Sequence, residues 1–223
     1  MITRKFRSSP VKVTGLTPDH VPFESSLEED CFFLLRFQED VETFDRPSEA
    51  VPWLDVTGVR RTYTPDVLIT FKAPEGAEAP PKLLAEIKPD FADDDSPRAR
   101  LPTRETDEER RMKWAAAKNF AKLRGWEFDV FRESDIRTPF LKNVKFLIRH
   151  LERPNKDRGA ERLIDALKAR GPTPMHALMF EMEPDRYKRA LLYPTLYACI
   201  AFGRITTDLK VLLKNDSLLT VPT

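Results

Sequence analysis

The chain has 223 residues, of which 41% are hydrophobic and 33% are charged, and its formal net charge is +1. This composition is that of an ordinary globular protein and excludes a wholly disordered chain. The balanced charge argues against a protein that binds nucleic acid by its overall charge alone. It stays compatible with an enzyme whose acidic site offsets basic surfaces that contact DNA.

Membrane and secreted proteins are also disfavoured. No run approaches the roughly 18 apolar residues that cross a bilayer, and the basic N-terminus lacks the apolar segment of a secretory signal. We therefore expect a cytoplasmic protein without a membrane partner. Cys31 and Cys199 lie in apolar helical patterns and are expected to be buried free thiols in a reducing compartment. The isolated residues His20, His150 and His176 give no basis for a structural zinc site.

The N-terminal part is expected to hold an arm, a helix and then strands. Residues 1–23, interrupted by proline and glycine, predict an irregular arm, and "SSLEEDCFFLLRFQ" after it predicts a helix that begins at Ser25 or Ser26. Strands are predicted for "VETFDR", "AVPWLDV", "RRTYTPDVLITF" and "KLLAEIKPD". The polar stretch "DFADDDSPRARLPTR" that follows is expected to be a mobile loop.

The clearest helix in the sequence covers residues 105–125. A capping box of Thr106 and Glu109 begins it, and Gly125 ends it. "WEFDVF" alternates as a strand does, and "TPFLKNVKFLIRHLE" predicts a helix with proline at its first position.

A linker is expected at residues 153–159, "RPNKDRG", followed by a second domain over 160–223. Three helices are predicted there, with Pro194 inside the last, and the final segment "RITTDLKVLLKNDSLLTV" is expected to add a short strand and a wing. Three helices followed by a small hairpin is the order of a winged-helix domain. The domains expected are thus an arm (1–23), a core (24–152) and a small helical domain (160–223).

Charged residues stand among apolar ones in two of the predicted strands. Asp66 follows a proline in "TYTPDVLITF", and Glu86 and Lys88 share one face of "LLAEIKPD", with Cα atoms roughly 6.6 Å apart. If these strands are neighbours, the three side chains converge at one edge of a sheet. Such a pattern also occurs by accident at solvated strand edges.

These residue types suit a hard divalent cation. Asp66, Glu86 and the carbonyl of Ile87 are ligands of the kind that Mg²⁺ prefers, and Lys88 would orient or deprotonate the attacking water beside a phosphate. Glu28 adds a fourth residue from the upstream helix, where it lies at the border of the apolar arc. A role for Glu28 restricted to a capping box from Ser25 is the alternative, and the two roles are compatible.

Four quoted segments together resemble a known family. "ESSLEEDCFFLLRFQEDVETFDRP", "YTPDVLI", "LLAEIKP" and "MKWAAAKNFAKLRGWEFDVF" occur in the order and spacing of the TnsA family, over roughly residues 20–150. These are the endonuclease subunits of heteromeric transposases, within the PD-(D/E)xK nuclease superfamily. The resemblance implies an α/β restriction-endonuclease-like core, a mixed central sheet flanked by helices, with a small C-terminal helical domain.

The resemblance also implies a reaction and partners. It implies Mg²⁺ dependence, with Mn²⁺ as a substitute, and cleavage of double-stranded DNA at the 5′ ends of a transposon. The partners would be a DDE-type transposase, which cuts the 3′ ends, and an AAA+ ATPase regulator. By motif, Glu28 matches the helix glutamate, Asp66 the "PD" aspartate, and Glu86 and Lys88 the "ExK". Some members carry glutamine at the position of Glu86.

Basic residues on three predicted helices are candidates to contact DNA phosphates, although such charges are commonly just solvated. They are Lys113, Lys118 and Lys122 on the first helix, Lys142, Lys145 and Arg149 on the second, and Arg186, Lys188 and Arg189 near the start of the last.

Two alternatives stay open beside a transposase subunit. One is a stand-alone phage or repair nuclease of the same superfamily, which the fold alone does not separate from it. The other is a binding module that recruits DNA or a regulator and has no catalytic activity.

Overall fold

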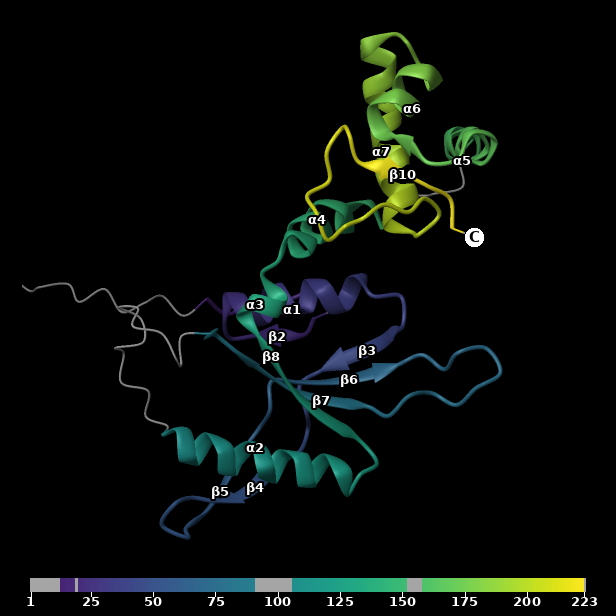
Figure 1. The fold of residues 1–223 in the computed structure, drawn as a ribbon. Coiled ribbons are helices and arrows are strands. Elements are labelled where there is room, and N and C mark those ends of the chain that lie inside the picture. Colours follow the sequence, from purple (N-terminus) through teal and green to yellow (C-terminus); the bar gives the residue numbers. More distant parts are fainter. Residues whose placement is uncertain (1–12, 19, 91–105, 152–157, 223) are drawn as a thin grey trace, which may run out of the picture. The chain divides into compact units, whose positions relative to one another are not determined.

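The computed structural model describes residues 13–18, 20–90, 106–151 and 158–222 (Figure 1). The chain divides into two compact units, residues 1–136 and 137–223, and each is described by itself. The loop predicted after the "ExK" strand and most of the predicted linker lie outside the described residues. No helix in the described part is both long and apolar enough to cross a membrane.

The predicted arm is partly ordered as a small hairpin. β1 (Gly15–Leu16) pairs antiparallel with β2 (Pro22–Phe23), and Phe23 is buried in the core. A Cβ at Gly15 would lie 2.5 Å from the Phe23 ring, so glycine is needed for this close approach. The expectation of an irregular segment up to residue 23 was therefore wrong for this part.

Helix α1 (Ser26–Phe37) begins where the sequence predicts. Ser25 is its N-cap, and the Ser25 side chain accepts a hydrogen bond from the Glu28 N–H. Its buried face consists of Leu27, Glu28, Asp30, Cys31, Phe32 and Leu35. Two of these are acids, which an apolar stripe alone does not explain.

The central sheet is mixed. Its strand order is β3 (Val41–Asp45), β6 (Val67–Phe71), β7 (Leu83–Lys88) and β8 (Glu127–Arg132). β3–β6 and β6–β7 are antiparallel, and β7–β8 is parallel. The parallel pair is connected through helix α2 (Asp107–Lys122), which packs on β8.

The segment predicted as one strand over 60–71 is two strands. β5 (Arg60–Tyr63) pairs with β4 (Val51–Leu54) in a separate ribbon, and β6 begins only at Val67. Pro65, which has no N–H to donate, lies in the break between them. The chain changes sheets there, so Tyr63 packs on the α2 side of the central sheet whereas Val67 packs on the α1 side.

Helices cover both faces of the central sheet (Figure 1). The α1 face buries Val67, Ile69, Ala85 and Ile87 against the helix, and α3 (Glu133–Ile136) adds Ile136. The α2 face buries Leu84 with Val51, Ala117 and Ala121. The alternation predicted for β7 is confirmed, since Ala85 and Ile87 lie on one face and Leu84 on the other.

Helix α2 has the predicted ends. Thr106 and Glu109 form a reciprocal capping box, and Gly125, just past the helix, adopts a left-handed φ of 69°.

The second unit contains the three predicted helices. Its elements are α4 (Pro139–Leu147), the 3₁₀ helix η2 (Ile148–His150), α5 (Arg158–Arg170), β9 (Thr173–Pro174), α6 (Met175–Met182), α7 (Arg186–Ala201) and β10 (Leu218–Leu219). β10 pairs antiparallel with β9, and Thr206 forms a bridge with Thr220. The winged-helix assignment stays a prediction.

Helix α4 packs within this second unit, although the sequence places the linker after it. It contacts α7, and Val144 and Leu147 are fully buried. Asn143 is buried as well, and its side chain holds the segment after α7 through hydrogen bonds to Leu209, Val211 and Leu213. The compact units thus divide after Ile136, which is earlier than residues 153–159.

Candidate active site

Asp66 lies immediately before β6 and is tied to the middle of β7. Its Oδ2 accepts a hydrogen bond of 2.7 Å from the Ile87 N–H. The ladder pairs Val67 with Ala85, so continuing it by one residue places Asp66 opposite Glu86. The adjacency predicted from "PD" and "ExK" is therefore present at one edge of the sheet.

Glu86 and Lys88 are held together on β7. Glu86 is only 3% exposed, and its Oε1 lies 2.6 Å from the Lys88 Nζ. The other oxygen, Oε2, is buried and has no hydrogen-bond partner. An unsatisfied carboxylate oxygen costs free energy unless a ligand compensates it.

Glu28 is buried at the start of α1, and both of its oxygens accept hydrogen bonds. Oε1 accepts from the Ser25 hydroxyl and Oε2 from the Glu24 N–H, each at 2.9 Å. Arg46 Nη2 lies 3.6 Å from Oε2. Glu28 therefore caps its own helix, and any metal-binding role uses the lone pairs that remain.

The electrostatics of Asp66 show that these groups are close. Burial, followed by the Glu86 and Glu28 carboxylates, raises the pKa of Asp66 to about 7, although the Ile87 N–H and Lys88 act in the opposite direction. Burial raises the pKa of Cys31 to about 12, with Asp66 as the next cause. Cys31 and Cys199 are both buried, and neither forms a disulfide within the described residues, as predicted.

The residues present fit a divalent cation in two respects. The orphaned Glu86 oxygen is an available ligand, and the Asp66 carboxyl, whose pKa is raised first by burial and then by the Glu86 carboxylate, lies beside it. The described residues hold no group of three or more His, Cys, Asp or Glu side chains spaced to hold a metal ion. The complete predicted ligand set is thus not gathered into a finished coordination shell.

Arg46 is a residue of this site that sequence reasoning missed. Burial by itself lowers the pKa of Arg46, but its hydrogen bond with Glu24 and the nearby Glu28 and Asp66 carboxylates outweigh burial and raise the pKa. Arg46 Nη1 binds Glu24 at 2.8 Å. No periodic pattern identifies it, because it follows β3 and reaches α1 only through the fold.

The basic residues predicted to face DNA differ in their surroundings. Lys113 lies over the Tyr63 ring, with Nζ 4.7 Å from the centroid. The others on α2, α4 and η2 are exposed, namely Lys118, Lys122, Lys142, Lys145 and Arg149. Their exposure leaves these cations accessible to a phosphate.

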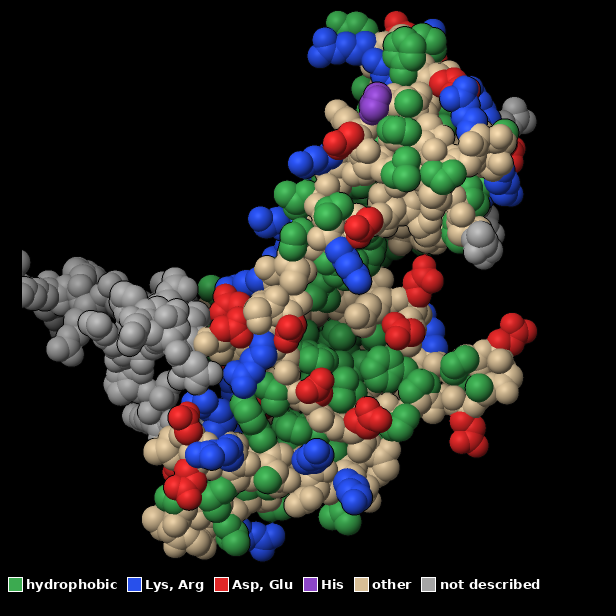
Figure 2. All heavy atoms as spheres, viewed as in Figure 1, with side chains coloured by type: hydrophobic (Ala, Val, Ile, Leu, Met, Phe, Trp, Pro, Cys, Tyr) green, Lys and Arg blue, Asp and Glu red, His purple; other side chains and the backbone are tan. Residues whose placement is uncertain are grey.

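The start of α7 has one arginine that is hydrogen-bonded to main-chain carbonyls and two exposed cations. Arg189 Nη1 donates to the carbonyls of Glu183 and Pro184, whereas Arg186 and Lys188 are exposed. In Figure 2, hydrophobic and basic side chains stand together at this end of the second unit. Tyr187 between them is 81% exposed.

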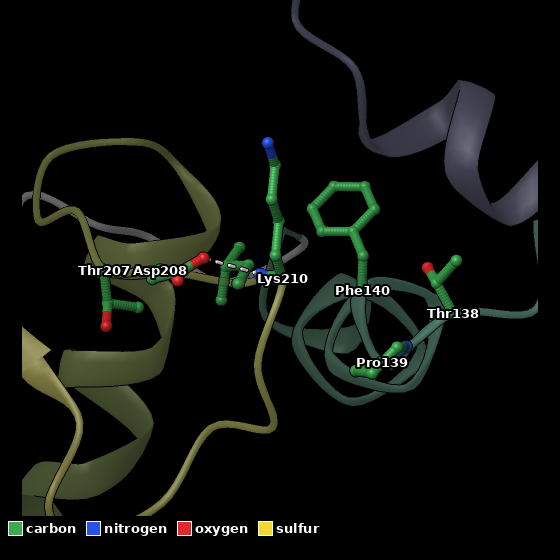
Figure 3. Close-up of a pocket in the computed structure, with 7 residues that line it drawn as sticks. Thr138, Pro139, Phe140, Thr207, Asp208 and Lys210 are labelled. Atoms are coloured by element: carbon green, nitrogen blue, oxygen red, sulfur yellow. Dashed lines mark hydrogen bonds between the residues drawn. The ribbon is translucent and has the colours of Figure 1, made fainter. Parts of the chain in front are cut away.

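A separate hollow of about 710 Å³ lies within the second unit. Figure 3 shows the Phe140 ring and the Lys210 side chain side by side along it, with Pro139 at the start of α4. The Lys210 N–H donates to Asp208 Oδ1 at 2.9 Å. None of the predicted site residues lines this hollow.

Comparison with known families gives a match over the central sheet. Residues 38–133 match the family model described as TnsA-like endonuclease N terminal. This range includes β3 to β8 and three of the four predicted catalytic residues, and Glu28 lies upstream of it. A search of curated proteins finds no match. The family match confirms the resemblance seen in the sequence.

Proposed function

We propose that this chain, whose residues 38–133 belong to the TnsA-like endonuclease N-terminal family, is a Mg²⁺-dependent DNA endonuclease subunit of a heteromeric transposase. The observation that carries the proposal is the hydrogen bond between Asp66 and the Ile87 N–H. It brings the "PD" aspartate to the "ExK" strand within the matched domain.

The surroundings of each residue indicate its proposed role in the reaction. Asp66 and Glu86 would hold the cation, with the Ile87 carbonyl and Glu28 as further candidate ligands. A Mg²⁺ ion held by these residues, or Mn²⁺ in its place, would supply Lewis-acid activation of water and would neutralise charge at the scissile phosphate. Lys88 is kept beside Glu86 by the 2.6 Å ion pair, where its ammonium would stabilise charge on the phosphate.

The family match supports a proposal for the biological setting. A TnsA-like subunit would cut the 5′ strand at transposon ends, beside a DDE-type transposase and under an AAA+ ATPase regulator. The exposed residues Arg186 and Lys188 of α7 support DNA contact by the second unit.

The test is a cleavage assay on a plasmid that carries both ends of the element encoding this chain, with and without the neighbouring transposase. The wild type is expected to nick the 5′ strands in Mg²⁺ and to be inactive in EDTA or Ca²⁺. Full cleavage by Asp66→Asn would contradict the proposed site. Cleavage of unrelated DNA without any partner would favour the stand-alone nuclease, and absence of Mg²⁺ or Mn²⁺ binding by calorimetry would favour the binding module.

Lys88→Ala is a poorer test than Asp66→Asn. Removing the ammonium leaves the buried Glu86 carboxylate without its charge partner, which destabilises the fold in addition to any effect on cleavage. Lys88→Arg keeps the charge and is the better companion variant.

A further inference from the structure

Arg132 is the neighbour of Lys88 in the sheet. In the parallel pair of β7 and β8, Lys88 is in register with Arg132 and Glu86 with Val130. Strands that pair in this way lie about 4.8 Å apart, and residues in register project from the same face. By alternation from Leu84 and Phe128, which both pack on the α2 side, that face is the one covered by α2.

Trp114 of α2 holds the Arg132 guanidinium. The Arg132 Cζ lies 5.4 Å from the centroid of the Trp114 ring, which is a favourable cation–π distance. The Trp114 Nε1 is buried and has no hydrogen-bond partner in the described part of the chain, so the ring acts here as a surface and not as a donor. A contact of this kind favours the guanidinium beside the ring and leaves its N–H groups available.

Several other arginines of the first unit are paired with acids, whereas the Arg132 guanidinium is not paired with an acid among the described residues. Arg46, Arg110 and Arg124 each form an ion pair with an acid. Within the described residues the Arg132 guanidinium forms none, and only its main-chain N–H donates, to Asp135 Oδ2 at 3.4 Å. The neighbouring carboxylate of Asp90 accepts the Ser134 N–H.

Lys88 alone supplies too little positive charge at this edge of the sheet to bind a phosphate. The Lys88 ammonium is already bound to Glu86, which offsets part of its charge. A guanidinium beside it would supply a second cation, with a planar fork that matches phosphate oxygens.

We propose that Arg132, oriented by Trp114, binds a phosphate of the DNA substrate next to Lys88. This rests on the proposed endonuclease function, and it makes Arg132 a substrate-binding residue. Trp114 is a positioning residue, because it acts only through Arg132.

The experiment measures DNA binding without cleavage. Fluorescence anisotropy with a transposon-end duplex in Ca²⁺, over a series of KCl concentrations, gives the dissociation constant and its salt dependence. Arg132→Gln is expected to weaken binding roughly tenfold and to reduce the salt slope by about 1. Arg132→Lys should keep the slope and recover only part of the affinity. Arg60→Gln, an exposed arginine at the far end of β5, is the matched control and should bind as the wild type does.

Trp114 variants separate positioning from folding. Trp114→Phe keeps a ring and loses no hydrogen bond, so its affinity and slope should stay near those of the wild type. Trp114→Leu should reproduce the weakening of Arg132→Gln, and the double variant should be no weaker than either single one. Thermal melts of each variant identify any loss of fold, and Arg132→Gln alone still decides the proposal if Trp114→Leu unfolds.

The outcomes distinguish this proposal from the proposed function. If Arg132→Gln binds with unchanged affinity and slope while the wild type cleaves, the phosphate contact is wrong and the endonuclease stands. If the wild type does not cleave but Arg132→Gln still loses affinity, the contact stands and the endonuclease is wrong. If Arg132→Gln binds DNA normally but no longer associates with the partner transposase, Arg132 binds a protein carboxylate and the proposal is overturned.

Discussion

The Ile87 N–H donates a 2.7 Å hydrogen bond to Oδ2 of Asp66, which joins the residue before β6 to the residue between Glu86 and Lys88. This bond fixes one aspartate oxygen against the main chain. The second oxygen, Oδ1, accepts no hydrogen bond from the described residues and stays available for a ligand. The geometry predicts that Asp66 can lose its charge without losing its place.

Asp66→Asn is therefore expected to abolish cleavage while the fold persists. The amide oxygen can still accept the Ile87 N–H, but the charge that would hold a cation is gone. We expect cleavage in Mg²⁺ to fall on the order of 10³-fold or more, with a melting temperature no lower than that of the wild type. The assay pairs plasmid nicking with thermal unfolding, and nicking at the wild-type rate would contradict the assignment.

The free energy of unfolding should depend on pH through the titration of the same Asp66 carboxylate. Without metal, the pKa of Asp66 is about 7 in the folded chain against an ordinary value of 3.8, so the native state binds this proton more tightly. The stabilisation that comes from protonating Asp66 in the native state is fully present below pH 4 and is lost as the pH rises to 7. The difference between Asp66→Asn and the wild type should therefore grow over this window, by on the order of a few kcal/mol.

Added Mg²⁺ gives the matching control for this titration. A cation that binds ionised Asp66 competes with the proton, so it should raise the melting temperature of the wild type more at pH 8 than at pH 6. Asp66→Asn should show neither the titration nor the Mg²⁺ effect. An equal rise for both proteins would place the cation elsewhere.

Local patterns predicted the parts of this site that belong to single elements. The Ser25 cap, the capping box of Thr106 and the alternation along β7 each depend on residues close in sequence, and each is confirmed. The break at Pro65 was not predicted. The alternation of apolar and polar residues continues across it in the sequence, although the chain passes there from one sheet to another.

Contacts between distant residues were not predictable in this way. Arg46 reaches Glu28, and Arg132 reaches Trp114, only after the helices have packed on the sheet. Asn143 is the same kind of residue in the second unit, since its partners lie more than sixty residues further along the chain. A polar residue within an apolar helix gave no sign of which main-chain groups it would bind.

Glu28 and Ser25 allow capping to be separated from catalysis. Glu28→Gln keeps an acceptor for the Glu24 N–H and removes the charge, so cleavage should fall strongly with little change in stability. Ser25→Ala removes the cap and should lower the free energy of unfolding by about 1 kcal/mol while cleavage persists. Cleavage and thermal melts of the two variants are compared directly. Wild-type cleavage by Glu28→Gln would reduce Glu28 to a capping residue.

Asn143→Ala should loosen the C-terminal segment of the second unit. The Asn143 amide donates to the carbonyls of Leu209 and Val211 and accepts the Leu213 N–H, at 2.7 to 2.9 Å. Losing these three bonds in a buried position should cost on the order of 3 kcal/mol. Hydrogen exchange of residues 206–220 measures the effect, and Asn215→Ala, at an exposed position, is the control. Unchanged protection in Asn143→Ala would show that the apolar contacts alone hold this segment.

The start of α7 should separate a structural arginine from cations that contact DNA. Arg189 holds the carbonyls of Glu183 and Pro184 and lies over the Phe180 ring, so Arg189→Ala should lower the melting temperature. Arg186 and Lys188 are exposed, so replacing both with glutamine should leave the melting temperature unchanged and reduce the salt slope of DNA binding by up to about 2. An unchanged slope in the double variant would show that Arg186 and Lys188 do not contact DNA. The exposed surface, which also carries hydrophobic side chains, would then be assigned to a protein partner.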